Sequence, residues 1–128
     1  QDRHRSAFSN YGPGLDLMAP GGFATTAGVE PLCAPSSSTT VLSTVPHLPG
    51  AASELNYACF AGTSMAAPFV AGVAALLMAN DADLTAAQTR DMLLASARFE
   101  EHMSAAEYGA GLVCADAALG ATTSCGAP

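Results

Sequence analysis

The amino-acid sequence predicts an α/β fold for this chain of 128 residues. Three observations support the prediction: a long uncharged apolar segment of helical length, a short strand that leads directly into it, and two more helix signals further along. Half of the residues are apolar, so the chain can bury a moderate core, and we expect one domain or part of one.

Three segments in the first half of the chain have strand character. Residues 15–18 lie between two Gly/Pro turns, residues 39–45 (TTVLSTV) are rich in β-branched side chains, and residues 57–60 (YACF) precede the apolar segment. Residues 23–38 consist largely of Ala, Thr, Gly, Pro and Ser without periodicity. We therefore expect a surface loop there rather than a domain boundary.

The apolar segment SMAAPFVAGVAALLMAN, residues 64–80, has no polar face. We therefore expect a helix enclosed by protein all round. Its longest uncharged apolar run, residues 66–79, falls short of the roughly 20 residues that cross a bilayer. Because proline has no N–H to donate to the preceding turn, regular helical bonding must begin near Pro68 or be locally broken just before it.

Two further helices are expected downstream. TAAQ, residues 85–88, is a capping box in which Thr85 takes the N-cap and Gln88 reaches back to its backbone N–H. A shorter helix is expected around residues 116–119, ending at Gly120. The buried side of the first of these helices is expected to comprise Met92, Leu93 and Ala97.

The charge of the chain excludes some classes of partner. Its formal charge is −7, and its four basic residues are all arginine. This balance argues against nucleic acid or an anionic membrane surface. The first residue is Gln1, with neither an initiator methionine nor a signal peptide before it, so we expect a piece of a longer protein.

Four cysteines, Cys33, Cys59, Cys114 and Cys125, show neither a C-x-x-C pair nor histidines at zinc-site spacing, so we expect no metal there. Two disulfides are the favoured use. Of the three pairings open to four cysteines, Cys33 with Cys59 and Cys114 with Cys125 close the shorter loops. Such bridges would place the protein in an oxidising, exported setting; the alternative is four buried free thiols.

Ser64 is the residue best placed for chemistry. It stands at the N-terminal end of the apolar helix, where unpaired backbone N–H groups and the helix dipole favour negative charge. A serine nucleophile needs a base to take its proton and donors to hold an oxyanion, and the helix end supplies a donor. The alternative is a serine that only caps the helix. The α/β-hydrolase motif G-x-S-x-G is excluded, because Ala66 replaces its second glycine.

Taken as a whole, GTSMAAPFVAGVAALL, residues 62–77, resembles the active-site serine motif of the subtilases, the subtilisin-like serine peptidases. FSNYGPGLDLMAPG and TVLSTVP before the serine resemble the same family, as do LTAAQTRDMLLASA and YGAGLVCADAAL after it. The resemblance implies that residues 1–128 are the C-terminal portion of a subtilisin-like catalytic domain. The implied fold is a three-layer α/β domain with a mostly parallel sheet.

The resemblance also implies roles for three neighbouring residues. Ser64 matches the nucleophile, its own backbone N–H would be one oxyanion donor, and the Thr63 hydroxyl would assist. Met65 matches the methionine beside the nucleophile. Its sulfoxide would place a polar, bulkier group against the site, so we expect sensitivity to oxidants.

By the same resemblance, the triad runs Asp, His, Ser along the chain, so its acid and base are expected upstream of Gln1 together with an oxyanion-binding asparagine. The histidines of this chain lack the His-Gly setting of the family's base. Asp16 matches a structural aspartate that assists a weak cation site in some members, but Gly14 here replaces an acidic neighbour. The residues set aside as base or oxyanion donor are His4, His47, His102, Asn10, Asn56 and Asn80.

Two hypotheses from different classes follow. The first is an exported, extracellular serine endopeptidase that cleaves polypeptides through Ser64, using the upstream part of its own domain. It takes no cofactor in this chain, any structural calcium lies elsewhere in the full domain, and neither nucleic acid nor a membrane is a partner. The second is a subtilase-like domain without its triad partners that acts as a binding or structural module. The joint presence of Gly62, Thr63, Ser64 and Pro68 favours the first hypothesis, because a binding module does not need that combination.

Overall fold

A computed structural model describes residues 4–22, 28–30, 40–46, 56–122 and 125. The chain divides into two compact units, and each is described by itself. One unit comprises residues 6–9 and 20–66, and the other comprises residues 1–5, 10–19 and 67–128.

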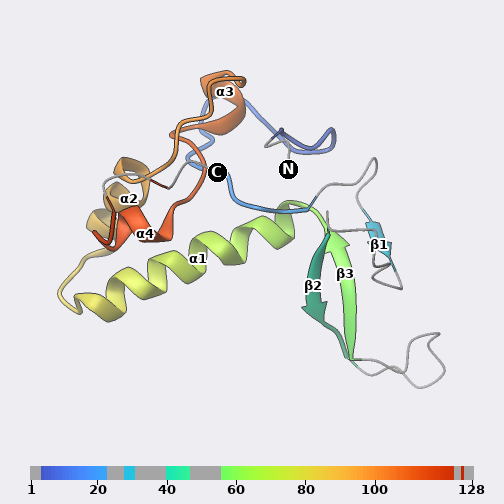
Figure 1. The fold of residues 1–128 in the computed structure, drawn as a ribbon, viewed down its shortest axis with the longest axis horizontal. Helices are drawn as coiled ribbons and strands as arrows, with labels where there is room; N and C mark the ends of the chain where they lie inside the picture. The colour runs from blue at the N-terminus through green and yellow to red at the C-terminus, as the bar shows by residue number, and fades with distance from the viewer. Residues whose placement is uncertain (1–3, 23–27, 31–39, 47–55, 123–124, 126–128) are drawn as a thin grey trace. The chain divides into compact units, whose positions relative to one another are not determined.

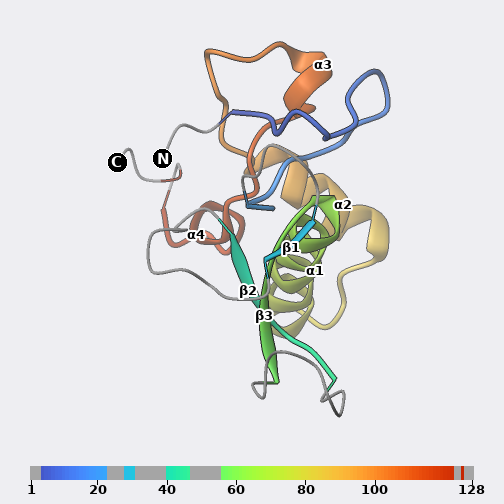
Figure 2. The same cartoon turned by 90° about the vertical axis from the view of Figure 1, so that its right-hand side faces the viewer.

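The unit that contains residues 20–66 is built on a three-stranded sheet in the order β1-β3-β2 (Figure 1). The strands are β1 (Gly28–Glu30), β2 (Val41–Thr44) and β3 (Tyr57–Ala61). Both outer strands pair antiparallel with β3, and Figure 2 shows β2 running beside it. The central strand is therefore hydrogen-bonded along both edges. Its buried residues are Ala58, Cys59 and Ala61.

The sheet differs in two ways from the sequence-based expectation. β1 lies inside residues 23–38, where the sequence predicts a loop. Its three residues show no alternation of apolar and polar side chains that would signal a strand, and pairing with β3 holds them. Residues 23–27 and 31–38 lie outside the described residues. A mostly parallel sheet is not confirmed, since β1 and β2 both pair antiparallel with β3. The strand expected at residues 15–18 is reduced to one parallel bridge between Met18 and Leu112.

Helix α1 (Thr63–Asn80) follows β3 with only Gly62 between them. Pro68 lies inside the helix. Because proline has no N–H, the carbonyl of Ser64, four residues earlier, receives no helical hydrogen bond from position 68. Of the two outcomes that the sequence leaves open at Pro68, the structure shows a local interruption of bonding and not a later helix start.

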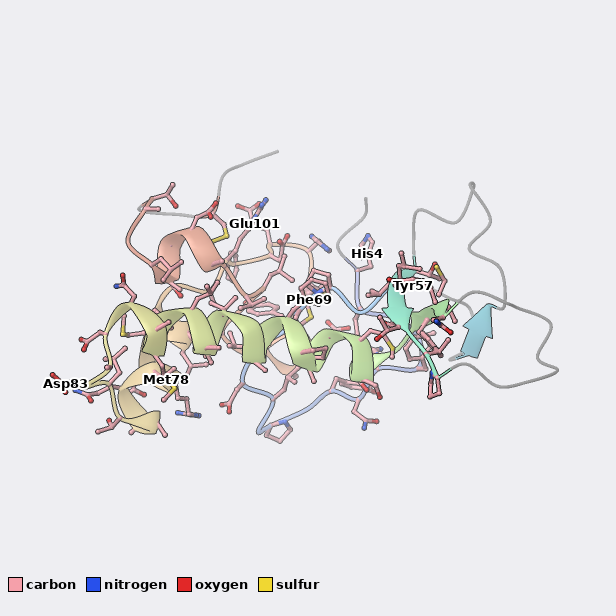
Figure 3. The ribbon with its side chains drawn as sticks, turned by 90° about the horizontal axis from the view of Figure 1, so that it is seen from below. His4, Tyr57, Phe69, Met78, Asp83 and Glu101 are labelled. Atoms are coloured by element: carbon pink, nitrogen blue, oxygen red, sulfur yellow. A yellow bond between two sulfur atoms is a disulfide. The ribbon has the colours of Figure 1, made fainter. Side chains whose placement is uncertain are left out.

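α1 is not enclosed all round, contrary to the expectation from its composition. Only Val73 and Leu77 are buried in it, whereas Phe69, Leu76 and Met78 are 43%, 50% and 48% exposed. Figure 3 shows Phe69 and Met78 on this helix. The described residues therefore leave these apolar side chains of α1 uncovered. Its 18 residues and mean hydropathy of 1.5 would by themselves also suit a membrane span, and core helices of soluble proteins share both features.

The unit that contains residues 67–128 holds the rest of α1 and three shorter helices. These are α2 (Ala86–Ala95), α3 (Ala105–Tyr108) and α4 (Ala115–Ala118). Both α2 and α4 contribute to one apolar core with α1, and partly buried side chains such as Leu17 pack around it. The buried members of that core are Val73, Leu77, Leu93 and Ala118.

The capping box of α2 is present as predicted. The Thr85 backbone N–H donates to Oε1 of Gln88 at 2.9 Å, and the Gln88 N–H donates to the Thr85 hydroxyl at 3.3 Å. The expectation that Met92 faces the core is wrong, because this side chain is 37% exposed. Leu93 is buried as predicted, and Ala97 is half-buried just beyond the end of the helix. Thr89 is buried in place of Met92, since residues four apart share one helix face with Leu93.

The other two helices differ in how well the sequence anticipates them. α4 starts one residue before the expected position, and Gly120 follows it with a φ of 72°. α3 is a single turn that the sequence analysis does not predict.

Cys114 precedes α4 and forms a disulfide with Cys125, the pairing favoured from the sequence. Cys59 is also disulfide-bonded, and Cys33 lies outside the described residues.

Candidate active site

Ser64 is exposed and lies at the second position of α1, directly after the central strand of the sheet. The path from strand to helix takes one residue, Gly62, so β3 fixes where the helix begins. β3 is the central strand and is hydrogen-bonded to a neighbouring strand along both edges. The Ser64 hydroxyl therefore lies on the first turn of a helix that the sheet anchors, and not on a loop.

The first turn of α1 provides donors beside that hydroxyl. The Gly62 carbonyl accepts hydrogen bonds from the N–H groups of Met65 at 3.0 Å and Ala66 at 3.3 Å. Thr63 and Ser64 precede these donors, and their N–H groups are among those that a helix leaves without an intrahelical partner. An anion near Ser64 could therefore accept a hydrogen bond from its backbone.

The electrostatics of the helix end favour negative charge as well. The aligned peptide dipoles of a helix place roughly half a positive charge at its N-terminus. The first turn of α1, all of which the structure describes, carries no acidic residue that would offset this charge. A developing oxyanion at Ser64 would be stabilised by both the N–H donors and the dipole.

A contact that the sequence analysis does not anticipate fixes the residue before this turn. The Gly62 N–H donates a 2.7 Å hydrogen bond to the carbonyl of Gly21. The sequence shows residues 20–22 only as a turn, and nothing in a Pro-Gly-Gly tripeptide identifies its distant partner. The glycine itself is the one available signal, because glycines permit close approach of two backbones.

The structure also describes the other residues singled out from the sequence. Thr63 is exposed beside it, and Met65 is half-buried in the same turn. Within the part of the chain that the structure describes, no hydrogen bond reaches the Ser64 hydroxyl. His4 and His102 contact each other, with ring centroids 4.5 Å apart, and His47 lies outside the described residues.

Asp16 forms an ion pair with a basic side chain. Its carboxylate binds the Arg90 guanidinium, with Oδ1 2.6 Å from Nη2 and Oδ2 3.4 Å from Nε. No group of three or more His, Cys, Asp or Glu residues gathers anywhere in the described ranges. The Asp16 carboxylate is therefore paired with Arg90 in this structure, and a carboxylate that binds a guanidinium does not fit a metal ion.

Comparison with known proteins decides the family. The model of the subtilase family matches residues 1–111, which include β3, α1 and Ser64. The chain belongs to the subtilase family. The match ends at residue 111, ahead of α4.

Individual subtilases resemble the chain at a similar level. It is 38% identical over 118 residues to alkaline elastase YaB of Bacillus sp. (strain YaB), and 37% identical over 116 residues to an extracellular protease of Xanthomonas campestris. It is also 37% identical to subtilisin Savinase of Lederbergia lenta over 118 residues. These alignments cover 92%, 90% and 92% of this chain, but only 24%, 17% and 34% of the relatives.

A solved structure of a protease from Pseudoalteromonas arctica matches the fold with a TM-score of 0.72 at 37% identity. The alignment covers 91% of this chain and 32% of the other. The chain therefore resembles this protease in its backbone as well as in its sequence. It spans about a third of the length of the solved relative.

Proposed function

We propose that this chain is the C-terminal portion of a secreted serine endopeptidase and that Ser64 is its nucleophile. The observation that carries the proposal is the position of Ser64, exposed at the start of α1 and directly after a strand paired on both edges. The names of the relatives support it, since they are called an elastase, an extracellular protease and a subtilisin.

The proposed reaction is acyl transfer. The Ser64 hydroxyl oxygen attacks the carbonyl carbon of a peptide bond while a histidine takes its proton, and the Ser64 N–H donates to the resulting oxyanion. Collapse of this intermediate breaks the C–N bond, and the histidine returns the proton to the leaving amine. Water then attacks the acyl-enzyme, which releases the acid and regenerates serine. The protein supplies every group in this scheme, so we assign no cofactor to the chain and place any structural calcium elsewhere in the full domain.

The histidine and its aspartate come, in this proposal, from an upstream part of the same domain. Support comes from α1, whose Phe69, Leu76 and Met78 are exposed apolar side chains along a helix that begins at the nucleophile. Exposed apolar surface of this kind is typical of a face that another protein segment covers. The upstream part would thus both complete the triad and cover α1.

The proposal is tested by replacing the nucleophile in the protein expressed from its complete coding sequence. Ser64→Ala should lower the rate of labelled casein hydrolysis by several orders of magnitude, because it removes the attacking oxygen. Ser96→Ala is the matched control: this serine ends α2 and its hydroxyl donates to the Met92 carbonyl at 2.8 Å, so activity should persist.

The alternative function is a binding or structural module without peptidase activity. It would be favoured if the wild type binds polypeptides without cleaving them and if Ser64→Ala leaves that binding unchanged. Hydrolysis that survives in Ser64→Ala would contradict the assigned nucleophile.

A further inference from the structure

The residues just before Ser64 are held from outside their own helix. The Gly62 N–H donates to the Gly21 carbonyl at 2.7 Å, while the Gly62 carbonyl accepts from Met65 and Ala66. Both polar groups of Gly62 are therefore engaged, one toward residues 20–22 and one within the first turn of α1. All of these residues belong to the same compact unit.

The contact leaves no room for a side chain at position 21. A Cβ built on Gly21 would lie 2.7 Å from the Gly62 carbonyl oxygen and 3.3 Å from the Ala66 Cβ. The first of these is too short for any real contact, and the obstructing atom is backbone that cannot rotate away. The two chain segments would have to separate, and the first turn of α1 would move with them.

A second hydrogen bond holds the other side of this segment. The Ser6 hydroxyl donates to the Gly22 carbonyl at 3.2 Å, in a part-buried position. Residues 20–22 are thus hydrogen-bonded to Ser6 through Gly22 and to Gly62 through Gly21. The position of Ser64 depends on this chain of contacts as well as on β3.

We infer that Gly21 is a positioning residue of the proposed active site. Its carbonyl binds the Gly62 N–H, and its missing side chain lets the two segments approach. Together they set the position of the turn that carries Ser64, and hence the direction from which the hydroxyl meets a substrate carbonyl. The inference rests on the proposed function. It predicts a defect in rate per active site, because small misplacement of a nucleophile slows attack more than it weakens substrate binding.

The test compares wild type, Gly21→Ala and Gly120→Ala in the protein expressed from its complete coding sequence. Gly120 has a φ of 72° and open space around it, so alanine there strains the backbone of the other compact unit without a clash. Active sites are first counted by the burst of a chromogenic ester that acylates serine. The values of kcat per counted site and KM are then measured with a peptide anilide that the wild type cleaves.

Gly21→Ala should lower kcat per counted site by about 100-fold, the scale of a 1 Å misplacement, with a smaller change in KM. Gly120→Ala should lower the number of active sites at most and leave kcat per site unchanged. A Gly21→Ala protein with the kcat per site of the wild type would overturn the inference. If the wild type itself shows no burst, the proposed function fails first, so the two failures are distinguishable.

Ser6→Ala keeps the test decisive if Gly21→Ala does not fold. It removes the Ser6 hydroxyl from the Gly22 carbonyl without introducing a clash. A reduction of kcat per site in the same direction, but smaller, is expected. An unchanged kcat per site would contradict the proposed chain of contacts from residue 6 to Gly62.

Discussion

Glu107 accepts two hydrogen bonds from Ser104, one from its backbone N–H at 3.0 Å and one from its hydroxyl at 2.9 Å. Both reach Oε2, while Oε1 lies 3.5 Å from Nε of Arg5. The backbone N–H of Ser104, its hydroxyl and the Arg5 charge all favour the carboxylate and lower the pKa of Glu107 below its ordinary value of 4.5. The start of α3 is therefore coupled to pH.

Glu107→Gln should lower stability at neutral pH, and the difference from wild type should vanish in acid. A lowered folded-state pKa contributes stability that is fully present above about 4.5 and is lost as pH falls through the folded value. Urea unfolding midpoints of both proteins at neutral pH and in acid measure the effect. Glu101→Gln, which removes a charge from an exposed turn (Figure 3), is the control. A gap between Glu107→Gln and wild type that persists in acid would refute the coupling.

Met65 should make the proposed peptidase activity sensitive to peroxide. Its side chain is half-buried in the same turn as Ser64, so conversion to the sulfoxide would place a polar, bulkier group there. Activity should fall in step with Met65 oxidation as followed by peptide mass spectrometry. Met65→Leu should resist, even after the exposed Met78 is oxidised. Full activity of a protein whose Met65 is demonstrably oxidised to the sulfoxide would contradict this prediction.

Two glycines with positive φ should differ in how much stability they contribute. Gly120 has a φ of 72° and open space, so alanine should cost about 1 kcal/mol of unfolding free energy from backbone strain alone. Gly109 has a φ of 61°, and a Cβ there would also collide with the backbone carbonyls of Leu15 and Asp16. Gly109→Ala should therefore be clearly more destabilising. Equal losses of unfolding free energy for the two variants would show that the backbone at residues 15 and 16 moves aside without cost, which would contradict the prediction.

The 128-residue segment produced by itself should expose apolar surface. Leu76 on α1 is 50% exposed, and Phe69 and Met78 on the same helix are exposed to a similar degree. We expect strong binding of a hydrophobic dye and self-association in size-exclusion chromatography. A sharp, cooperative thermal transition of a monomer that does not bind the dye would argue against an uncovered face on α1.

The parts of the fold that the sequence predicts well are those with local signals. The capping box at Thr85 and Gln88 places the start of α2, and Gly120 marks the end of α4. The motif around Ser64 identifies the start of α1. In each case, residues within one helical turn determine the outcome, so no knowledge of distant contacts is needed.

The parts that the sequence does not predict depend on distant partners. β1 exists because it pairs with β3. The Gly21–Gly62 contact joins two segments between which all three strands lie in the sequence. α3 is a different case, because Ser104 and Glu107 form the same S-x-x-E pattern that signals other helices. Its signal is easily missed since Gly109 ends the helix after one turn, before any apolar periodicity develops.

The central claim is that Ser64 is an activated nucleophile, and covalent labelling tests it most directly. The protein from its complete coding sequence is treated with diisopropyl fluorophosphate, digested and mapped by mass spectrometry. We predict a single phosphorylated serine, Ser64, with loss of activity in proportion to labelling and no labelling of protein denatured beforehand. Absence of label on Ser64 in an active, folded preparation would contradict the account.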